Sequence, residues 1–183
     1  MPYLIRPARV DDAGELLAIY APFVTDTTVS FETEVPSVEE FRARIERGLS
    51  SFAYLVAVDE QTGSIAGYAY YGPFRSRPAY AWSVEISIYL AAEHRGNGLG
   101  GTRLGALEAC MRAQGVHTSI ACITSSNKGS IAFHEKHGYR VCGTHAACGY
   151  KLGSWLDITW MEKRITPGDA EPQPLIQLSP SCE

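Results

Sequence analysis

A glycine-rich run in the middle of the chain is the clearest candidate for chemistry. Residues 95–101 read RGNGLGG, after an apolar stretch at residues 84–90 and before an amphipathic segment that begins near Thr102. Glycines lack a Cβ atom, so they adopt positive φ and let backbone N–H groups close around an anion. At the start of a helix, the positive end of the helix dipole adds to that attraction. The run therefore predicts a strand-to-helix turn that binds phosphate.

Two common phosphate-binding motifs fail to fit this run. A P-loop ends in GK(S/T), but Gly100, Gly101 and Thr102 include no lysine. A dinucleotide-binding fingerprint has the order GxGxxG at the first strand of its fold, whereas this run has the order GxGxG at mid-chain. A tight turn without any ligand stays open as the structural alternative. The pattern that remains is RxxGxG, from Arg95 to Gly100.

A carboxylate interrupts the apolar strand that precedes the run. Side chains alternate along a strand, so Glu85 shares one face with Ser83, Ser87 and Tyr89, while the apolar residues take the other face. Such a carboxylate could remove the proton of an incoming ammonium group as a general base, directly or through water. It could also anchor that group by its charge. A solvated outer face of the sheet is the alternative.

The stretches around the run alternate between helical and strand periodicity. Apolar residues recur at helical spacing after Asp11 and again after Ser37, which predicts two helices. Strands are expected at residues 52–58 and 64–71, joined as a hairpin, and at residues 81–90, 117–124, 139–147 and 155–165, with a turn at 149–153. Further helices follow the glycine run as far as Gly115 and cover residues 127–137. The order β-α-α-β-β-β-α-β-α-β-β indicates an α/β layered sheet with a ligand in its middle crevice.

Composition limits what the chain can be. Its 183 residues, 45% of them apolar, suffice for a single domain over residues 1–165. The proline-rich tail at residues 166–183 is expected to be extended and partly disordered, or else to lie over a partner subunit. With a net charge of −4 and no apolar run of membrane-spanning length, we expect no nucleic-acid or membrane partner and a cytoplasmic location. Five cysteines without CxxC spacing predict buried free thiols, with no disulfide framework and no metal site.

A second motif lies downstream of the run. Residues 127–139, NKGSIAFHEKHGY, resemble the pattern Nxx[AS]xxxYxxxG[FY] of the GCN5-related N-acetyltransferase (GNAT) superfamily, and RxxGxG resembles its acetyl-CoA pyrophosphate loop. His134 stands where many members carry a tyrosine thought to protonate the CoA thiolate. With the segments WSVE (82–85), FRSR (74–77) and YKLGSWLD (150–157), the chain resembles the phosphinothricin and methionine sulfoximine acetyltransferase branch over residues 5–165.

This resemblance implies a fold and an acetyl donor. The fold is the GNAT fold, with a mixed central sheet of about six to seven strands flanked by helices. The donor is acetyl-CoA, whose amide-rich pantetheine arm would pair with the strand end before the loop if that strand forms an open edge. The residues implied in acetyl-CoA binding are Ile88, Tyr89, Leu90, Arg95, Gly96, Asn97, Gly98, Leu99, Gly100, Gly101, Asn127 and Ser130.

The resemblance also implies how an acceptor is bound. Arg75 and Arg77 suit a substrate with carboxylate and phosphinate or sulfone oxygens, because a guanidinium fork matches such groups, although an exposed loop could carry both without a ligand. Glu85 is the implied base or ammonium anchor, and His134 the implied acid or second base. The implied substrate-binding residues are Phe31, Phe74, Arg75, Arg77, Pro78, Ala79, Tyr80 and Glu85.

The resulting hypothesis is an N-acetyltransferase. It moves acetyl from acetyl-CoA to the α-amino group of a small amino acid analogue of the phosphinothricin, methionine sulfoximine or methionine sulfone type, by direct transfer in a ternary complex. The resemblance also implies a homodimer. A GNAT enzyme for another amine, such as an aminoglycoside, a polyamine or a protein N-terminus, is one alternative. A non-catalytic acetyl-CoA sensor is another.

Overall fold

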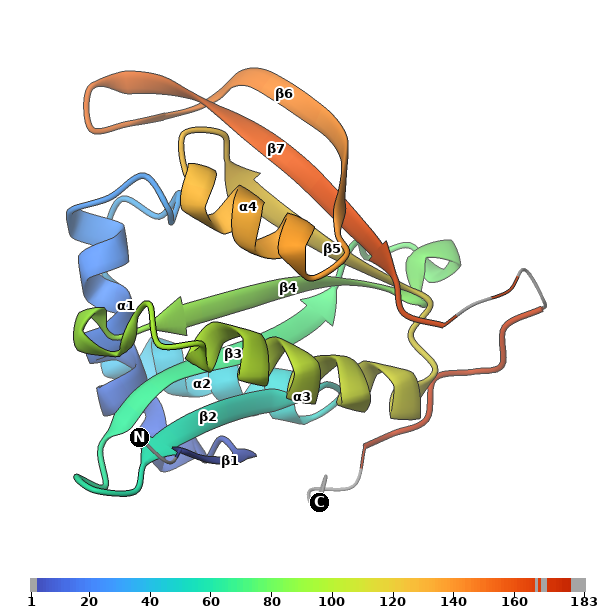
Figure 1. Cartoon of the computed structure of the whole chain (residues 1–183), viewed down its shortest axis with the longest axis horizontal. Coiled ribbons are helices and arrows are strands. Elements are labelled where there is room, and N and C mark those ends of the chain that lie inside the picture. Colours follow the sequence, from blue (N-terminus) through green and yellow to red (C-terminus); the bar gives the residue numbers. More distant parts are fainter. Residues whose placement is uncertain (1–2, 167, 169–170, 179–183) are drawn as a thin grey trace.

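Alternating apolar residues build one seven-stranded sheet in the computed structural model, which describes residues 3–166, 168 and 171–178. The strands follow the order β1-β2-β3-β4-β5-β7-β6 (Figure 1). They are β1 (Tyr3–Pro7), β2 (Tyr54–Asp59), β3 (Ile65–Pro73), β4 (Ser83–Leu90), β5 (Thr118–Thr124), β6 (Arg140–Lys151) and β7 (Ser154–Arg164). The helices are α1 (Ala13–Thr25), α2 (Val38–Leu49), α3 (Leu99–Gln114) and α4 (Lys128–Lys136), with 3-10 turns η1 (Val10–Asp12), η2 (Pro78–Tyr80) and η3 (Ala92–His94).

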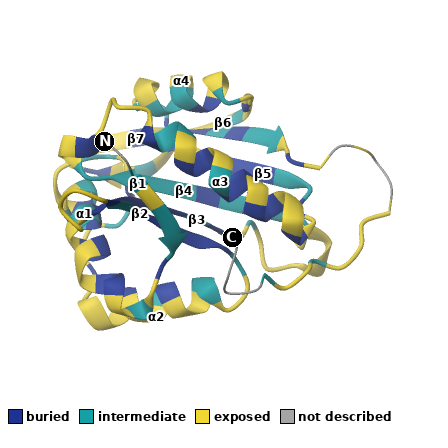
Figure 2. Ribbon diagram, turned by 60° about the horizontal axis from the view of Figure 1, so that its bottom comes forward, coloured by how far each residue is buried: buried dark blue, intermediate teal, exposed yellow. Residues whose placement is uncertain are grey.

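Helices cover both faces of the sheet. On one face, α1 and α2 bury Leu16 and Ile45 against Tyr68 of β3. On the other face, α3 buries Leu104 and Leu107 against apolar side chains of β2 to β5. Figure 2 shows the buried sides of α2 and α3 turned toward the sheet between them. The two apolar layers hold the sheet rigid from both sides, so its strand ends are fixed positions for a site.

The sheet divides between β4 and β5. Strands β1 to β4 pair antiparallel in sequence order, and β5, β7 and β6 form a second antiparallel group. The two groups are joined by a short parallel pairing of Ser83–Glu85 with residues 118–120. Beyond Glu85, β4 pairs only with β3, so the side of residues 86–90 that faces β5 is an open edge. We call this place the fork.

The predicted order of elements is confirmed, and local sequence explains several boundaries. The Oγ of Ser37 accepts a hydrogen bond from the N–H of Glu40 at 3.1 Å, which caps the start of α2. Gly115 adopts a left-handed conformation with φ of 89°, which ends α3 as expected. The hairpin between β2 and β3 turns at the expected residues, where the N–H of Gly63 donates to the carbonyl of Asp59.

Three details differ from the sequence prediction. Helix α3 begins at Leu99, three residues before the expected start near Thr102, because the left-handed Gly98 already turns the chain into it. Strand β6 continues through the expected turn at residues 149–153 as far as Lys151. The expectation of buried thiols is wrong for three cysteines: Cys110 is buried, but Cys122, Cys142 and Cys148 are exposed, and Cys182 lies outside the described residues.

The described part of the tail lies against its own chain. The indole N–H of Trp82 donates to the carbonyl of Gln173 at 2.7 Å, and the N–H of Ile176 donates to the carbonyl of Gln114 at 2.9 Å. Leu175 and Leu178 pack against the core under α3. Residues 171–178 are extended, as expected, but they are ordered by these contacts.

Candidate active site

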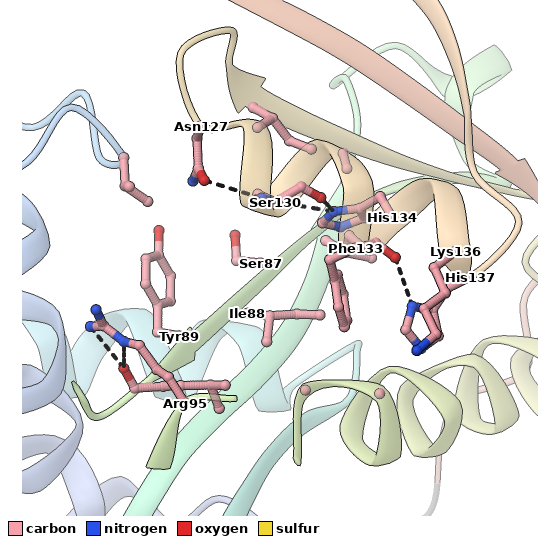
Figure 3. A pocket seen from close by; sticks show the side chains of 18 of the residues that line it. Ser87, Ile88, Tyr89, Arg95, Asn127, Ser130, Phe133, His134, Lys136 and His137 are labelled. Atoms are coloured by element: carbon pink, nitrogen blue, oxygen red, sulfur yellow. Dashed lines mark hydrogen bonds between the residues drawn. The ribbon is translucent and has the colours of Figure 1, made fainter. Parts of the chain in front are cut away.

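A cavity of about 750 Å³ opens at the fork. Strand β4 lines it on one side and β5 on the other, and the N-terminal end of α3 and one side of α4 along its length close it (Figure 3). Arg95 and Lys136 are its fixed cations, and no Asp or Glu is among its lining residues. The cavity thus combines an open strand edge with a positive rim, although the whole chain carries a net charge of −4.

The glycine run forms one end of this cavity. Gly96 and Gly98 have φ of 79° and 83°, values that a residue with a Cβ atom rarely adopts. Arg95 closes the turn, because its Nε and Nη2 both donate to the carbonyl of Leu90 at 3.2 Å. Its guanidinium also lies 4.9 Å from the ring centroid of Phe23. The turn therefore presents its backbone and the first turn of α3 to the cavity.

Two residues of the run point away from the cavity. The Nδ2 of Asn97 donates to the hydroxyl of Tyr3 at 2.8 Å, and its Oδ1 accepts the N–H of Leu99 at 3.2 Å. Leu99 is buried among Ala57 and Ala66. The sequence grouped both with the cofactor-binding residues, but their side chains hold the loop to the sheet and do not line the cavity.

Strand β4 contributes the predicted residues Ile88, Tyr89 and Leu90, together with Ser87. The Tyr89 ring packs edge-on against Tyr20 at 5.1 Å and Phe23 at 5.2 Å between ring centroids. This burial raises the pKa of Tyr89 well above its ordinary value, so its hydroxyl stays protonated. The strand end is rigid, and its backbone faces the cavity.

Helix α4 brings Asn127, Ser130 and His134 to the same cavity. The Oδ1 of Asn127 caps the helix by accepting the N–H of Ser130 at 3.1 Å. His134 is buried, and its Nδ1 donates to the carbonyl of Ser130 at 2.8 Å. Because a carbonyl oxygen can only accept, Nδ1 carries the proton of the neutral ring and Nε2 is left as an acceptor. Burial lowers the pKa of His134, so the ring is mainly neutral at neutral pH.

Glu85 lies at the branching point of the fork. It pairs in register with Ile120, the last pair before β4 and β5 separate. Burial raises the pKa of this half-buried carboxyl, and the nearby charge of Arg75 opposes that shift. Glu85 does not line the cavity itself, but Cys122 does. Although the residue is partly exposed, desolvation of its thiol together with the charge of Glu85 raises the pKa of that thiol to about 12. A carboxyl with a raised pKa beside a cavity suits a general base.

The predicted acceptor residues between β3 and β4 form a separate group on the surface. The guanidinium of Arg75 stacks 4.1 Å above the Phe74 ring and 5.5 Å from the Trp160 ring of β7. The Tyr80 ring meets the other edge of Phe74, with 5.8 Å between ring centroids. The group is completed by Arg77, Pro78 and Ala79, which are exposed and lie outside the cavity lining. Of this group, only Arg75 is close enough to act on Glu85 by its charge.

The loop between α1 and α2 reaches the site from the other side. Val29 of this loop lines the cavity. The ring of Phe31 lies so close to Gly149 of β6 that a Cβ atom on Gly149 would overlap it. The buried Nζ of Lys151 donates to the carbonyls of Ser30 at 2.6 Å and Phe23 at 3.4 Å. Lys151 is therefore the clamp between this loop and the β6–β7 hairpin.

The remaining hairpin residues that carried the resemblance have structural surroundings. The Oδ1 of Asp157 accepts the N–H of Ala147, a residue with φ of 48° where β6 bulges. Trp155 is 68% exposed and packs only against the Tyr150 ring. Sequence reasoning missed several cavity residues. Phe23, Val29 and Thr124 come from segments without a motif, whereas Phe133, Lys136 and His137 stand at variable positions of the motif at residues 127–139.

Replacing Lys151 by methionine should loosen the loop that it clamps. The buried carbonyl of Ser30 would lose its partner, so we expect a loss of about 1–3 kcal/mol in the free energy of unfolding. Urea denaturation of the variant and the parent measures this directly. If the clamp also positions the acceptor, KM for the acceptor rises while the affinity for coenzyme A does not change. An unchanged midpoint of unfolding would contradict the clamp.

Neither a metal site nor a membrane-spanning helix is found in the described part of the chain. No three histidine, cysteine, aspartate or glutamate side chains gather there in a way that could hold a metal ion. No helix among residues 3–166 is both long and apolar enough to cross a membrane.

Comparisons with known proteins agree with this geometry. Residues 5–160 match the family described as the acetyltransferase (GNAT) domain. The L-methionine sulfoximine/L-methionine sulfone acetyltransferase of Pseudomonas paraeruginosa is 38% identical over 172 residues, which are 92% of this chain and 98% of that protein. The structure of a GNAT superfamily phosphinothricin acetyltransferase from Sinorhizobium meliloti in complex with AcCoA matches with a TM-score of 0.90 and 35% identity, covering 94% of each chain.

A further solved structure is named for a different kind of acceptor. The ribosomal-protein-alanine N-acetyltransferase from Brucella melitensis matches with a TM-score of 0.84 and 40% identity, covering 88% of this chain and 99% of that one. The matched segment includes the fork, the glycine turn and helix α4, which together form the cavity. The chain therefore belongs to the GNAT family of acetyltransferases.

Proposed function

We propose that this acetyltransferase moves the acetyl group of acetyl-CoA to the α-amino group of a small amino acid analogue, of the phosphinothricin, methionine sulfoximine or methionine sulfone type. The observation that carries the proposal is the fork, with an anion-binding turn at one end of its cavity and Glu85 at its branching point. The substrate class follows the names of the relatives from Pseudomonas and Sinorhizobium. Transfer is direct, in a ternary complex.

The cavity suits the shape and charge of acetyl-CoA. The open edge of residues 86–90 offers unpaired backbone groups to the amides of a pantetheine arm, as an added strand would receive them. The turn at residues 95–101 and the first turn of α3 offer N–H groups to the pyrophosphate. When bound, acetyl-CoA supplies the activated acetyl group as a thioester. A backbone N–H of β4 that points at the thioester oxygen would polarise it.

Glu85 is our candidate for the base. The acceptor amine reaches the protein as an ammonium ion, which cannot attack a carbonyl until it loses a proton. The raised pKa of Glu85 brings its proton affinity closer to that of the acceptor amine. Its position at the fork puts it near the end of the cavity where the acetyl group would lie. The carboxylate takes the proton directly or through one water. The positive charge of Arg75 compensates part of the negative charge of Glu85.

His134 is our candidate for the second proton-transfer group. Its neutral ring has Nε2 free to accept, since Nδ1 is held by the carbonyl of Ser130. After the amine attacks the thioester carbon, its nitrogen carries two protons and a positive charge, and Nε2 can accept one of the two protons, which leaves the N–H of the amide product. The resulting imidazolium can then give that proton to the departing thiolate, which returns the ring to its neutral form. Base and acid are therefore successive roles of one side chain.

The acceptor subsite is proposed beside Glu85, between the loop that joins α1 to α2 and the connection that joins β3 to β4. Arg75 and Arg77 would hold the carboxylate and the phosphinate or sulfone oxygens, and Phe31, Phe74 and Tyr80 would enclose the apolar part of the acceptor.

We further propose a cytoplasmic location and a homodimer. The dimer would be formed through the β6–β7 hairpin, which leaves large side chains on its surface. Those side chains are Tyr150, Leu152 and Trp155, which are 59%, 58% and 68% exposed. The GNAT domain is assigned to residues 1–165 and the tail to residues 166–183.

Release of the CoA thiol from acetyl-CoA tests the proposed substrate. The acceptors are L-phosphinothricin, L-methionine sulfoximine, L-methionine sulfone, a polyamine, an aminoglycoside and a peptide with an N-terminal alanine. We expect kcat/KM for the amino acid analogues to exceed that for each other amine by at least about 100-fold, because the arginine contacts exist only for the analogues. Preference for the peptide would instead support the activity named for the Brucella structure. Cofactor binding without turnover would support a sensor.

A further inference from the structure

His137 lines the cavity but has no part in the mechanism above. It follows the last residue of α4 and faces the N-terminal end of α3 (Figure 3). Its Nδ1 donates to the carbonyl of Phe133 at 2.7 Å, and its ring packs against the Phe133 ring with 4.4 Å between centroids. These two contacts fix the orientation of the imidazole.

The second ring nitrogen of His137 lies over the glycine turn. A Cβ atom on Gly101 would be 2.8 Å from His137 Nε2, so this nitrogen sits against the first turn of α3. Because Nδ1 carries the proton of the neutral ring, Nε2 is an acceptor at high pH and becomes a cationic donor once the ring is protonated. It therefore adds a titratable group beside N–H groups that already attract anions.

The charges around His137 are mostly positive. On α4, Lys136 lies in the cavity lining beside the mainly neutral His134, whereas Glu135 is exposed and lies outside the lining. The turn before α3 contributes Arg95 to the lining. On α3 itself, the guanidinium of Arg103 is fully buried and donates to the carbonyl of Tyr89. Behind α4, Lys163 of β7 passes beside Gly138 and is bound by Glu108 of α3, with N–O distances of 2.7 and 2.8 Å. No carboxylate among the described residues lines the cavity near the imidazole.

A cluster of cations around helical N–H groups requires an anion of high charge. We propose that His137 in its imidazolium form is a further ligand for the phosphate groups of acetyl-CoA, because Nε2 can then donate a hydrogen bond to a phosphate oxygen. This inference rests on the proposed function, because it takes acetyl-CoA as the ligand of the cavity. The shared chemistry is a phosphate oxygen, from either the pyrophosphate or the 3′-phosphate.

Calorimetric titration of the full chain with coenzyme A tests this inference. The variant His137→Asn keeps a donor for the carbonyl of Phe133 and removes Nε2. We expect it to bind coenzyme A about 5-fold more weakly than the parent, and this difference should be larger at about pH 6 than at about pH 8, because more of an imidazole is protonated at lower pH. His117→Gln, which changes a histidine outside the cavity, should follow the parent at both pH values.

Two shorter ligands identify the phosphate. If the 3′-phosphate is bound, 3′-dephospho-coenzyme A binds parent and variant equally at each pH. If the pyrophosphate is bound, the difference persists with dephospho-coenzyme A and disappears with pantetheine. Comparing the two proteins at one pH also removes the titration of the 3′-phosphate itself, whose second proton dissociates near pH 6.

A second variant guards against loss of structure in the first. His137→Lys places a fixed charge at the same position, so its advantage over His137→Asn in affinity for coenzyme A should be equal at the two pH values. Equal affinities of parent, His137→Asn and His137→Lys at both pH values would overturn the role of His137. In that case coenzyme A still binds and the proposed function stands, whereas failure of the parent to bind coenzyme A would overturn the proposed function itself.

Discussion

Replacing Glu85 by glutamine should lower kcat for the best acceptor by about 10²–10⁴-fold, the usual contribution of a general base. Glutamine keeps the size of the side chain and its place at the end of the β4–β5 pairing, but it cannot take a proton. Coenzyme A should bind the variant as it binds the parent, because Glu85 is not among the residues that line the cavity. Steady-state kinetics together with calorimetric binding separates these two effects.

The pH profile gives a second test of the same base. Glu85 must be deprotonated to accept a proton, so activity falls as pH drops through its pKa. Burial raises that pKa, which moves the acidic limb of kcat/KM to a higher pH than an exposed glutamate would give. In Glu85→Gln this contribution should disappear, and the fall in activity that remains at acidic pH belongs to His134, which must be neutral to accept a proton.

A matched control is available for Glu85. Glu60 is an exposed carboxylate in the β2–β3 turn, away from the cavity, and Glu60→Gln should retain the activity and pH profile of the parent. If Glu85→Gln raises KM for the acceptor and leaves kcat unchanged, Glu85 is an ammonium anchor. If both constants and the acidic limb are unchanged, Glu85 has no role in the reaction.

Replacing Gly67 by alanine should destabilise the protein by about 3–5 kcal/mol, the sum of backbone strain and overpacking. Gly67 has φ of 153°, which a residue with a Cβ atom rarely adopts. A Cβ atom there would overlap the carbonyl oxygen of Tyr89 and approach Arg103 Nη1 to 2.5 Å and the Cα of Leu90 to 2.9 Å. The backbone of β4 cannot yield without moving the open edge of the fork.

Gly72 provides the comparison on the same strand. A Cβ atom on Gly72 meets nothing within 4 Å, and its φ is not positive, so Gly72→Ala should change the free energy of unfolding by less than about 1 kcal/mol. Urea denaturation of the two variants measures the difference. A Gly67→Ala variant as stable as the Gly72→Ala variant would mean that β3 and β4 can separate at this point without cost.

Local sequence was sufficient to predict the order of elements and the main part of the cavity. Glycines that require positive φ, such as Gly96 and Gly98, mark a turn wherever it occurs. Asn127 caps its helix through the N–H of Ser130, three residues away, so the signal and its effect lie in one short segment. The open edge of β4, which the sequence offered only as a condition for pairing with a pantetheine arm, is present.

Contacts between distant segments could not be predicted from such patterns. The partner of Asn97 is Tyr3, 94 positions away, and the clamp of Lys151 on Ser30 spans 121 positions. A lone asparagine beside a phosphate loop suggests a ligand contact, and only the position of β1 shows that its amide is turned to the sheet. The separation of Arg77 from the cavity has the same origin, since the path of the β3–β4 connection depends on tertiary packing.

The tail changes how its composition should be understood. Pro172 and Pro174 stand within an extended segment whose order comes from a few hydrogen bonds and from Leu175 and Leu178. Proline has few backbone conformations in the unfolded chain, so fixing such a segment costs less entropy than fixing an ordinary one. A small number of contacts is then enough to hold it in place. A cut after Arg164 would therefore remove apolar surface from the folded unit. We expect limited proteolysis of this enzyme to stop at a point beyond its last strand.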